Sequence, residues 1–122
     1  MITIKTAELL GAALDWAIAQ IEHVAVTVNG EFPEKVFIGD KKGLIKALYK
    51  PSTDWAQGGP LIDKFNVLLG ASLGTPLAIC RVATDRGMRE SQCEGSTKLI
   101  AAMRAIVAAH FGDELLIPKE LA

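Results

Sequence analysis

Apolar residues recur at intervals of three and four near the start of the chain, which predicts a helix over residues 7–22 with Thr6 as its N-cap. Its apolar stripe consists of Leu10, Leu14, Ala17, Ile18 and Ile21. The acidic residues of this segment fall on the opposite side of the predicted helix: Glu8, Asp15 and Glu22. The segment therefore predicts an amphipathic helix that packs on a core through one face.

The same spacing returns near the end of the chain and predicts a second long helix, with Ser96 as N-cap and Gly112 as its stop. Its apolar stripe consists of Leu99, Ile100, Met103, Ile106 and Val107. Alanines fill much of the other side: Ala101, Ala102, Ala105, Ala108 and Ala109. Because alanine lets another backbone approach closely, we expect this helix either to be buried between two layers or to form a homo-oligomer contact.

Strand patterns lie between the two helices. Val24, Val26 and Val28 alternate with polar or small residues, and Asn29-Gly30 suits a two-residue hairpin turn before a returning strand at 36–38. Residues 67–84 predict two short apolar strands around Gly-Thr-Pro, and 115–117 predict a short strand.

Two segments are less regular. Residues 43–50 fit either a helical turn or a strand, which must end before Pro51. Residues 85–96 are polar, and we interpret them as a loop. Together the patterns predict a single α+β domain over residues 1–122, with two main helices packed on a small, mostly antiparallel β-sheet.

Composition narrows the classes of protein. Half of the 122 residues are hydrophobic and 22% are charged, as in globular domains. Thirteen basic residues face fourteen acidic ones, so the net charge disfavours a nucleic acid as partner. No apolar run reaches the roughly 20 residues that span a bilayer. The chain has two cysteines without a paired-motif spacing, which suits a reducing compartment, and we expect a cytoplasmic protein that contacts no membrane.

The sequence carries no recognisable catalytic motif. The segment "GASLGTP" lacks the features of a phosphate-binding loop or a dinucleotide fingerprint. No two of the histidines and cysteines have the spacing of metal ligands, so we expect neither a metal nor a cofactor. Ser52 and Cys93 are conceivable nucleophiles without a histidine nearby in the sequence. We therefore name no catalytic residue and favour a protein that is not an enzyme, although distant partners leave an enzyme open.

The segment "KPSTDWAQGGPLI", residues 50–62, is the candidate site. A structural interpretation explains most of it, because Ser52 or Asp54 suits backbone capping and the glycines and prolines suit turns. On that interpretation the ring of Trp55 fills the core below the loop. The alternative is a binding surface on an irregular segment, where binding residues are often found. Its candidate residues are Ser52, Thr53, Asp54, Trp55, Gln57, Gly58 and Gly59.

Four lysines precede this segment with no acidic residue among them: Lys41, Lys42, Lys46 and Lys50. A solvated surface is the commoner role of such a run. The alternative is a rim that attracts anions beside a pocket, with Lys46 and Lys50 as candidate ligand-binding residues.

Three blocks carry a resemblance to a family. "TAELLGAALDWAIA", "PSTDWAQGGPLI" and "LIAAMRAIVAAHFGDELLIPKEL" resemble, in this order, the small phage and prophage proteins of the NinX type. Two segments depart from that family: "EGSTKL" stands where its members have Gly-Pro-Thr-Pro, and "LAICRVATDRG" stands where they tend to have a tryptophan-containing strand. The resemblance implies a phage accessory protein whose molecular function the family does not define.

We therefore expect a non-enzymatic accessory protein that binds a host protein or a small anionic ligand in the cytoplasm of the bacterial host. The alternative is a protein that binds a nucleotide, or an enzyme that acts on a nucleotide-derived molecule, with lysine against phosphate and Trp55 against the base.

Overall fold

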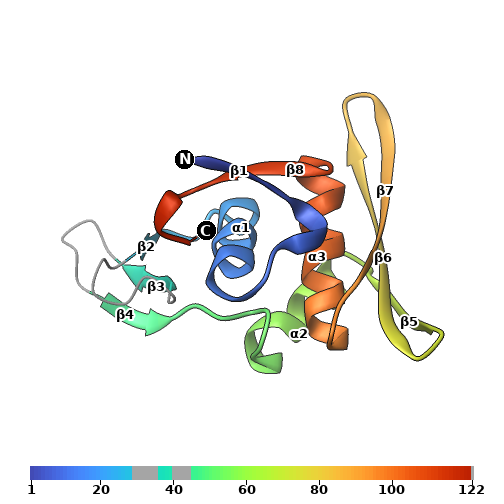
Figure 1. Ribbon diagram of the computed structural model, residues 1–122, viewed down its shortest axis with the longest axis horizontal. Helices are drawn as coiled ribbons and strands as arrows, with labels where there is room; N and C mark the ends of the chain where they lie inside the picture. Colours follow the sequence, from blue (N-terminus) through green and yellow to red (C-terminus); the bar gives the residue numbers. More distant parts are fainter. Residues whose placement is uncertain (29–35, 40–44, 122) are drawn as a thin grey trace.

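The computed structural model describes residues 1–28, 36–39 and 45–121 (Figure 1). The strands are β1 (Ile2–Lys5), β2 (Val26–Val28), β3 (Val36–Gly39), β4 (Ile45–Leu48), β5 (Leu68–Ser72), β6 (Thr75–Thr84), β7 (Gly87–Glu94) and β8 (Glu114–Ile117). The helices are α1 (Gly11–Glu22), α2 (Trp55–Lys64) and α3 (Lys98–Phe111), with short 3-10 turns η1 (Thr6–Glu8) and η2 (Lys119–Leu121).

The described strands form three separate antiparallel sheets, with the orders β1-β8, β2-β3-β4 and β5-β6-β7. The α+β class and the antiparallel pairing are confirmed. The strands are divided among three small sheets, whereas the sequence suggests one, because the pattern of a strand does not indicate its neighbour. No described helix has both the length and the apolar character needed to cross a membrane.

Helix α3 is the centre of the fold. It lies between the β5-β6-β7 sheet on one side and α1 with the β1-β8 pair on the other (Figure 1). Its alanine face and its apolar stripe are both buried, as expected for a helix that lies between two layers. The alanine face is therefore not available for a homo-oligomer contact.

The helix starts differ from the prediction. Residues 6–8 form a 3-10 turn, and α1 begins only at Gly11. Thr6 is buried and does not cap α1, because its hydroxyl donates to Gly112 O over 2.7 Å and so joins the start of the chain to the end of α3. Thr97, one residue after the expected Ser96, caps α3 by accepting from the Ile100 N–H at 3.1 Å. The stop at Gly112, at φ 89°, is confirmed.

Two of the strands, β7 and β1, are not predicted by the sequence pattern. Residues 87–94, interpreted as a loop, form the edge strand β7. Their outward face is polar or exposed, so no apolar alternation marks them. Residues 2–5 pair with the expected strand near the C-terminus, so β1 depends on a partner more than 100 positions away.

The other strand predictions are largely confirmed. Residues 68–72 and 75–84 form a hairpin around Leu73 and Gly74, which have the positive φ angles of a tight turn. Residues 45–48 are a strand that ends before Pro51. β2 and β3 pair antiparallel with Val28 opposite Val36, and the predicted turn residues Asn29 and Gly30 lie outside the described residues.

Candidate functional site

The segment from Lys50 to Asp54 is an ordered turn that leads into α2, as its proline and capping residues suggest. The N–H groups of Thr53 and Asp54 donate to Lys50 O at 3.2 and 2.9 Å. Asp54 is the N-cap of α2, and its carboxylate accepts from the Ala56 N–H at 3.0 Å. The cap offsets the poor helix propensity of the Gly58-Gly59-Pro60 sequence inside α2.

Gln57 fixes α2 to the end of β4. Its Nε2 donates to Leu48 O at 3.0 Å, and its Oε1 accepts from the Lys50 N–H at 2.8 Å. Both ends of the amide are therefore used within the chain. The contribution of Gln57 to a site is to hold the turn in place, since its polar atoms already have partners.

Gly58 permits the closest approach in this segment. A Cβ at this position would lie 2.2 Å from Pro51 O and 2.7 Å from Leu99 Cδ1 of α3. Only glycine lets α2 pack this closely on both the turn and α3. Gly59, by contrast, faces outward under the ring of Trp55, whose Cε3 would lie 3.8 Å from an added Cβ.

A buried carboxylate holds the turn from below. Asp15 of α1 is only 5% exposed, and its Oδ1 accepts from the Ser52 N–H at 2.8 Å. The sequence places Asp15 on the polar side of its helix, and that expectation is wrong. A signal was present, since Asp15 is the only charged residue among the otherwise apolar positions 12–19.

Burial raises the pKa of Asp15 to about 6, although the side-chain hydroxyl of Ser52 near the carboxylate, and the Ser52 N–H that donates to it, have the opposite effect. The Ser52 side chain is 1% exposed, and its hydroxyl has no hydrogen bond of good geometry in the described part of the chain. Asp15 and Ser52 thus form a buried polar contact that joins α1 to the turn. Both residues support the segment and neither faces a ligand.

Trp55 stands on the outside of this framework. Its side chain is 55% exposed at the first residue of α2, so the ring does not fill the core and the favoured structural interpretation of this residue is wrong. The tryptophan was expected inside because its ring is large and apolar. Pro51, Ser52, Gly58 and Leu61 are the buried residues of the segment instead.

The structure therefore divides the candidate residues into two groups. Ser52, Gln57 and Gly58 support the turn, and Asp54 caps the helix. The exposed group is the Trp55 surface, which we define as Lys50, Thr53, Trp55, Ala56 and Pro60, with Gly59 beneath the ring. Lys46 lies on β4, but its side chain is outside the described part, so its relation to this surface stays a prediction.

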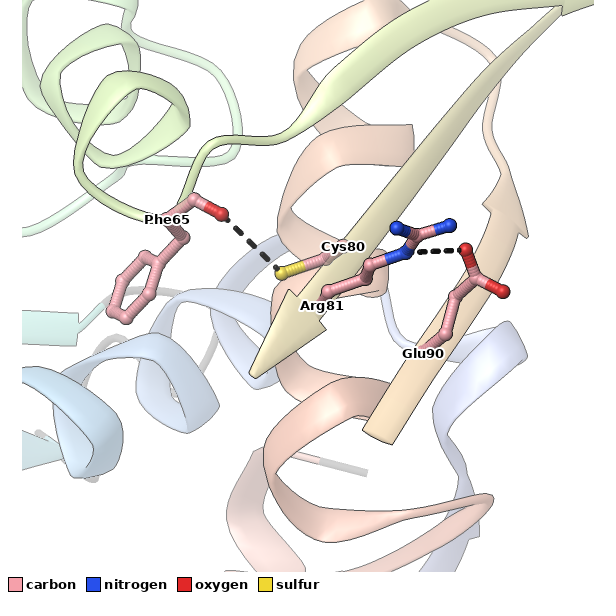
Figure 2. A network of polar contacts seen from close by, with 4 residues as sticks. All are labelled: Phe65, Cys80, Arg81 and Glu90. Atoms are coloured by element: carbon pink, nitrogen blue, oxygen red, sulfur yellow. Dashed lines mark hydrogen bonds and ion pairs between the residues drawn. The ribbon is translucent and has the colours of Figure 1, made fainter. Parts of the chain in front are cut away.

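Neither cysteine has the environment of a nucleophile. Burial raises the pKa of Cys80 to about 11 and also raises the pKa of Cys93, so both thiols are protonated at neutral pH. Figure 2 shows the Cys80 Sγ, which lies 4.0 Å from Phe65 O. The described residues contain no group of three or more histidine, cysteine or acidic side chains that would hold a metal.

His110 has its partners within the chain. Its Nδ1 lies 2.7 Å from Ile106 O, and its ring meets the Phe65 ring edge-on with centroids 5.1 Å apart. Both contacts hold the His110 ring within the fold.

Comparison with known families identifies the family of the chain. The model of a family described as "Bacteriophage P22, NinX" matches residues 5–110, which include the Trp55 surface and its supporting residues. A comparison with curated proteins gives no match. Because the family model spans most of the sequence, the chain belongs to the bacteriophage P22 NinX family.

Proposed function

We propose that this phage-encoded accessory protein is a non-enzymatic binding protein that engages a host protein through the Trp55 surface, in the cytoplasm of the bacterial host. The observation that carries the proposal is the position of Trp55, which is more than half exposed at the start of a helix. That helix start is held by the Asp54 cap and by Gln57. The ring is thus both exposed and held on an ordered support.

These two properties are those of an interface anchor. Tryptophan is enriched among the residues that dominate binding energy at protein interfaces. An anchor on a preformed surface loses little conformational freedom when a partner binds. Gly59 lies below the ring without a side chain, and Ala56 and Pro60 of the same helix are exposed, so a partner can contact both the ring and the helix.

A nucleotide or a related anionic ligand is the second candidate, supported by the exposure of both Lys50 and Trp55. Stacking of a base on the ring would contribute about 1–3 kcal/mol. The Asp54 carboxylate opposes this function, because it occupies a helix N-terminal N–H and places negative charge where a phosphate would approach. The geometry therefore favours a protein partner.

Quantitative affinity capture from a host lysate tests the proposal. We expect the unmodified protein to retain a host polypeptide that Trp55→Ala retains at least about tenfold less, as for a loss of 1.4 kcal/mol or more. Leu73→Ala is the matched control, because Leu73 is fully exposed on the β5–β6 turn and lies outside the Trp55 surface. Both variants should have a free energy of unfolding close to that of the unmodified protein, since neither side chain is buried.

The captured polypeptide, once purified, should bind the unmodified protein and Leu73→Ala with similar affinity. It should bind Trp55→Ala at least about tenfold more weakly. Equal capture by Trp55→Ala and Leu73→Ala would remove Trp55 from the interface. A thermal-shift series with nucleotides distinguishes the second candidate. Stabilisation by a nucleotide that is lost in Trp55→Ala would replace the protein partner with a small ligand, and turnover of that nucleotide would establish an enzyme.

A further inference from the structure

The strand β7 has one open edge. It is the last strand of the β5-β6-β7 sheet. Just after β7 ends, the Gly95 N–H donates to Pro76 O at 3.1 Å, which identifies this as a hydrogen-bonded pair of the ladder. Because hydrogen-bonded and non-bonded pairs alternate along an antiparallel ladder, Cys93 and Ser91 turn their backbone groups toward β6. Gln92 and Glu94 must then turn theirs to the open edge. Arg104 confirms the direction, because its Nη1 donates to Glu94 O from that side at 2.9 Å.

The same alternation turns the backbone N–H and C=O groups of Met88 and Glu90 to the open edge, together with those of Gln92. In the part of the chain that the structure describes, no backbone hydrogen bond outside the ladders reaches these three residues. A strand edge with unpaired donors and acceptors is a template for another strand.

A groove follows this edge. Two adjoining hollows of about 660 and 510 Å³ share Ala7, Gln92 and Cys93 as lining residues. The β7 backbone forms one wall, and the ends of β1 and β8 form the other, with α3 below. Several lining residues are small, which leaves room for an incoming backbone: Ala7, Ser91, Cys93, Ala108 and Gly112.

Charge indicates which kind of strand fits. The side chains of Glu90 and Glu94 alternate with Gln92 along the exposed face of β7, and Asp113 and Glu114 line the opposite wall. Glu90 pairs with Arg81 at 2.8 Å (Figure 2), whereas the other three carboxylates belong to neither ion pair that the described residues form.

Three cations also line the groove, but one of them is already engaged. Arg104 Nε donates to Leu9 O at 2.7 Å, in addition to its bond to Glu94 O, so its guanidinium joins two segments of this chain. Arg104 keeps its positive charge and Glu90 is paired with Arg81, so the charges that line the whole groove nearly balance. The local charge on the strand itself favours a basic segment, because the face of β7 that carries Glu90, Gln92 and Glu94 has two carboxylates and no cation of its own.

A second copy of the chain fits this edge poorly. Twofold antiparallel pairing of β7 centred on Gln92 would set each Glu90 opposite a Glu94, and pairing centred on Glu90 would set that residue opposite itself. Like charges directly opposite each other destabilise a strand pair. Lysine or arginine on the incoming strand would instead form favourable cross-strand pairs.

We propose that the groove beside β7 binds an extended, basic peptide segment of a partner protein, which adds to the β5-β6-β7 sheet as a fourth strand. The segment carries lysine or arginine at alternate positions opposite Glu90 and Glu94, and small apolar residues between them face Cys93 and Ala108. This site shares no residue with the Trp55 surface, so it is independent of the proposed function.

The test uses a peptide of alternating lysine and valine as a probe and the full chain labelled with ¹⁵N. We expect the peptide to shift the amide signals of Met88, Glu90 and Gln92 and to protect these amides from hydrogen exchange. A peptide of alternating glutamate and valine is the matched control. It should bind at least about tenfold more weakly, a difference of 1.4 kcal/mol or more.

Two variants separate backbone pairing from charge. Gln92→Pro removes an N–H that points to the open edge and not to β6, so the sheet should tolerate it while peptide affinity falls about tenfold or more. Glu94→Lys keeps the backbone and should reverse the preference between the two peptides. Should Gln92→Pro fail to fold, Glu94→Lys and the amide shifts decide the question alone.

Several outcomes would overturn the proposal. One is that neither peptide binds, and another is that both peptides bind equally well. A third is that the peptide shifts only amide signals of another surface. Concentration-dependent dimerisation that protects the Gln92 amide without peptide would show that a second copy occupies the edge instead.

Discussion

Gly58→Ala is expected to lower the free energy of unfolding by about 1–3 kcal/mol, the usual cost of overpacking a filled site. The added Cβ would meet the Pro51 carbonyl oxygen at 2.2 Å and the Leu99 Cδ1 at 2.7 Å, far inside contact distance. The first neighbour is backbone and cannot rotate away. Either the turn or α2 must therefore move, and both of them support the Trp55 surface.

Gly59→Ala is the matched control, one position along the same helix. Its Cβ would make an ordinary 3.8 Å contact with Trp55, and replacement of an interior helical glycine by alanine should stabilise the protein by up to about 1 kcal/mol. Urea unfolding of the two variants measures the difference. Equal midpoints for both would show that α2 does not pack on the turn and α3 as described.

Asp15→Asn is expected to stabilise the protein at pH 7 by about 3 kcal/mol and to leave it unchanged near pH 3. Burial raises the pKa of Asp15 from 3.8 to about 6, a shift that corresponds to about 3 kcal/mol. Asparagine keeps the shape and an oxygen that accepts from the Ser52 N–H. Its amide N–H groups can also donate to the buried Ser52 hydroxyl, which has no partner of good geometry.

The sign follows from proton binding. Between pH 3.8 and about 6 the folded protein holds the Asp15 proton while the unfolded chain has released it. Unfolding therefore releases a proton, and the stability that Asp15 provides falls as pH rises through this window. Below the window both states are protonated, and above it the burial of the charge opposes folding in full.

Urea unfolding of both proteins between pH 3 and pH 7 isolates this effect, because other carboxylates contribute equally to the two curves and cancel in their difference. Tyr49, whose pKa is raised to about 12 by burial and by Glu22 and Asp15, stays neutral over the whole range. A constant difference between the two proteins would mean that Asp15 is exposed. At pH 3, where Asp15 carries no charge, Asp15→Ala should destabilise the protein, since it leaves the Ser52 N–H without its acceptor.

The sequence predicts those elements whose cause is local. The stripe of α3, its glycine stop and the strand expected at 115–117 depend on neighbouring residues, and each is present. The same holds for the order of the Lys50–Asp54 turn, because Pro51 and the Asp54 cap act within a few positions. Residues 43–50 fit a helical turn or a strand equally well, and the structure has the strand, at 45–48.

Sequence reasoning fails where the cause is a distant residue. Asp15 is buried because the Ser52 N–H, 37 positions away, gives it a partner, so periodicity alone assigned it to the wrong side. β7 is a strand because β6 pairs with it, although its own residues are polar. Trp55 is exposed although its residue type indicates the opposite, and it is Gly58 of the same helix that packs closely on Leu99 of α3.

Acrylamide quenching of Trp16→Phe, in which Trp55 is the only tryptophan, tests the central claim most directly. The substitution keeps an aromatic ring at a half-buried position of α1. We predict substantial quenching of the remaining indole in the folded protein, in keeping with its 55% exposure, and only a modest further increase on unfolding in urea. Strong shielding that disappears on unfolding would show a buried ring and would contradict a binding surface centred on Trp55.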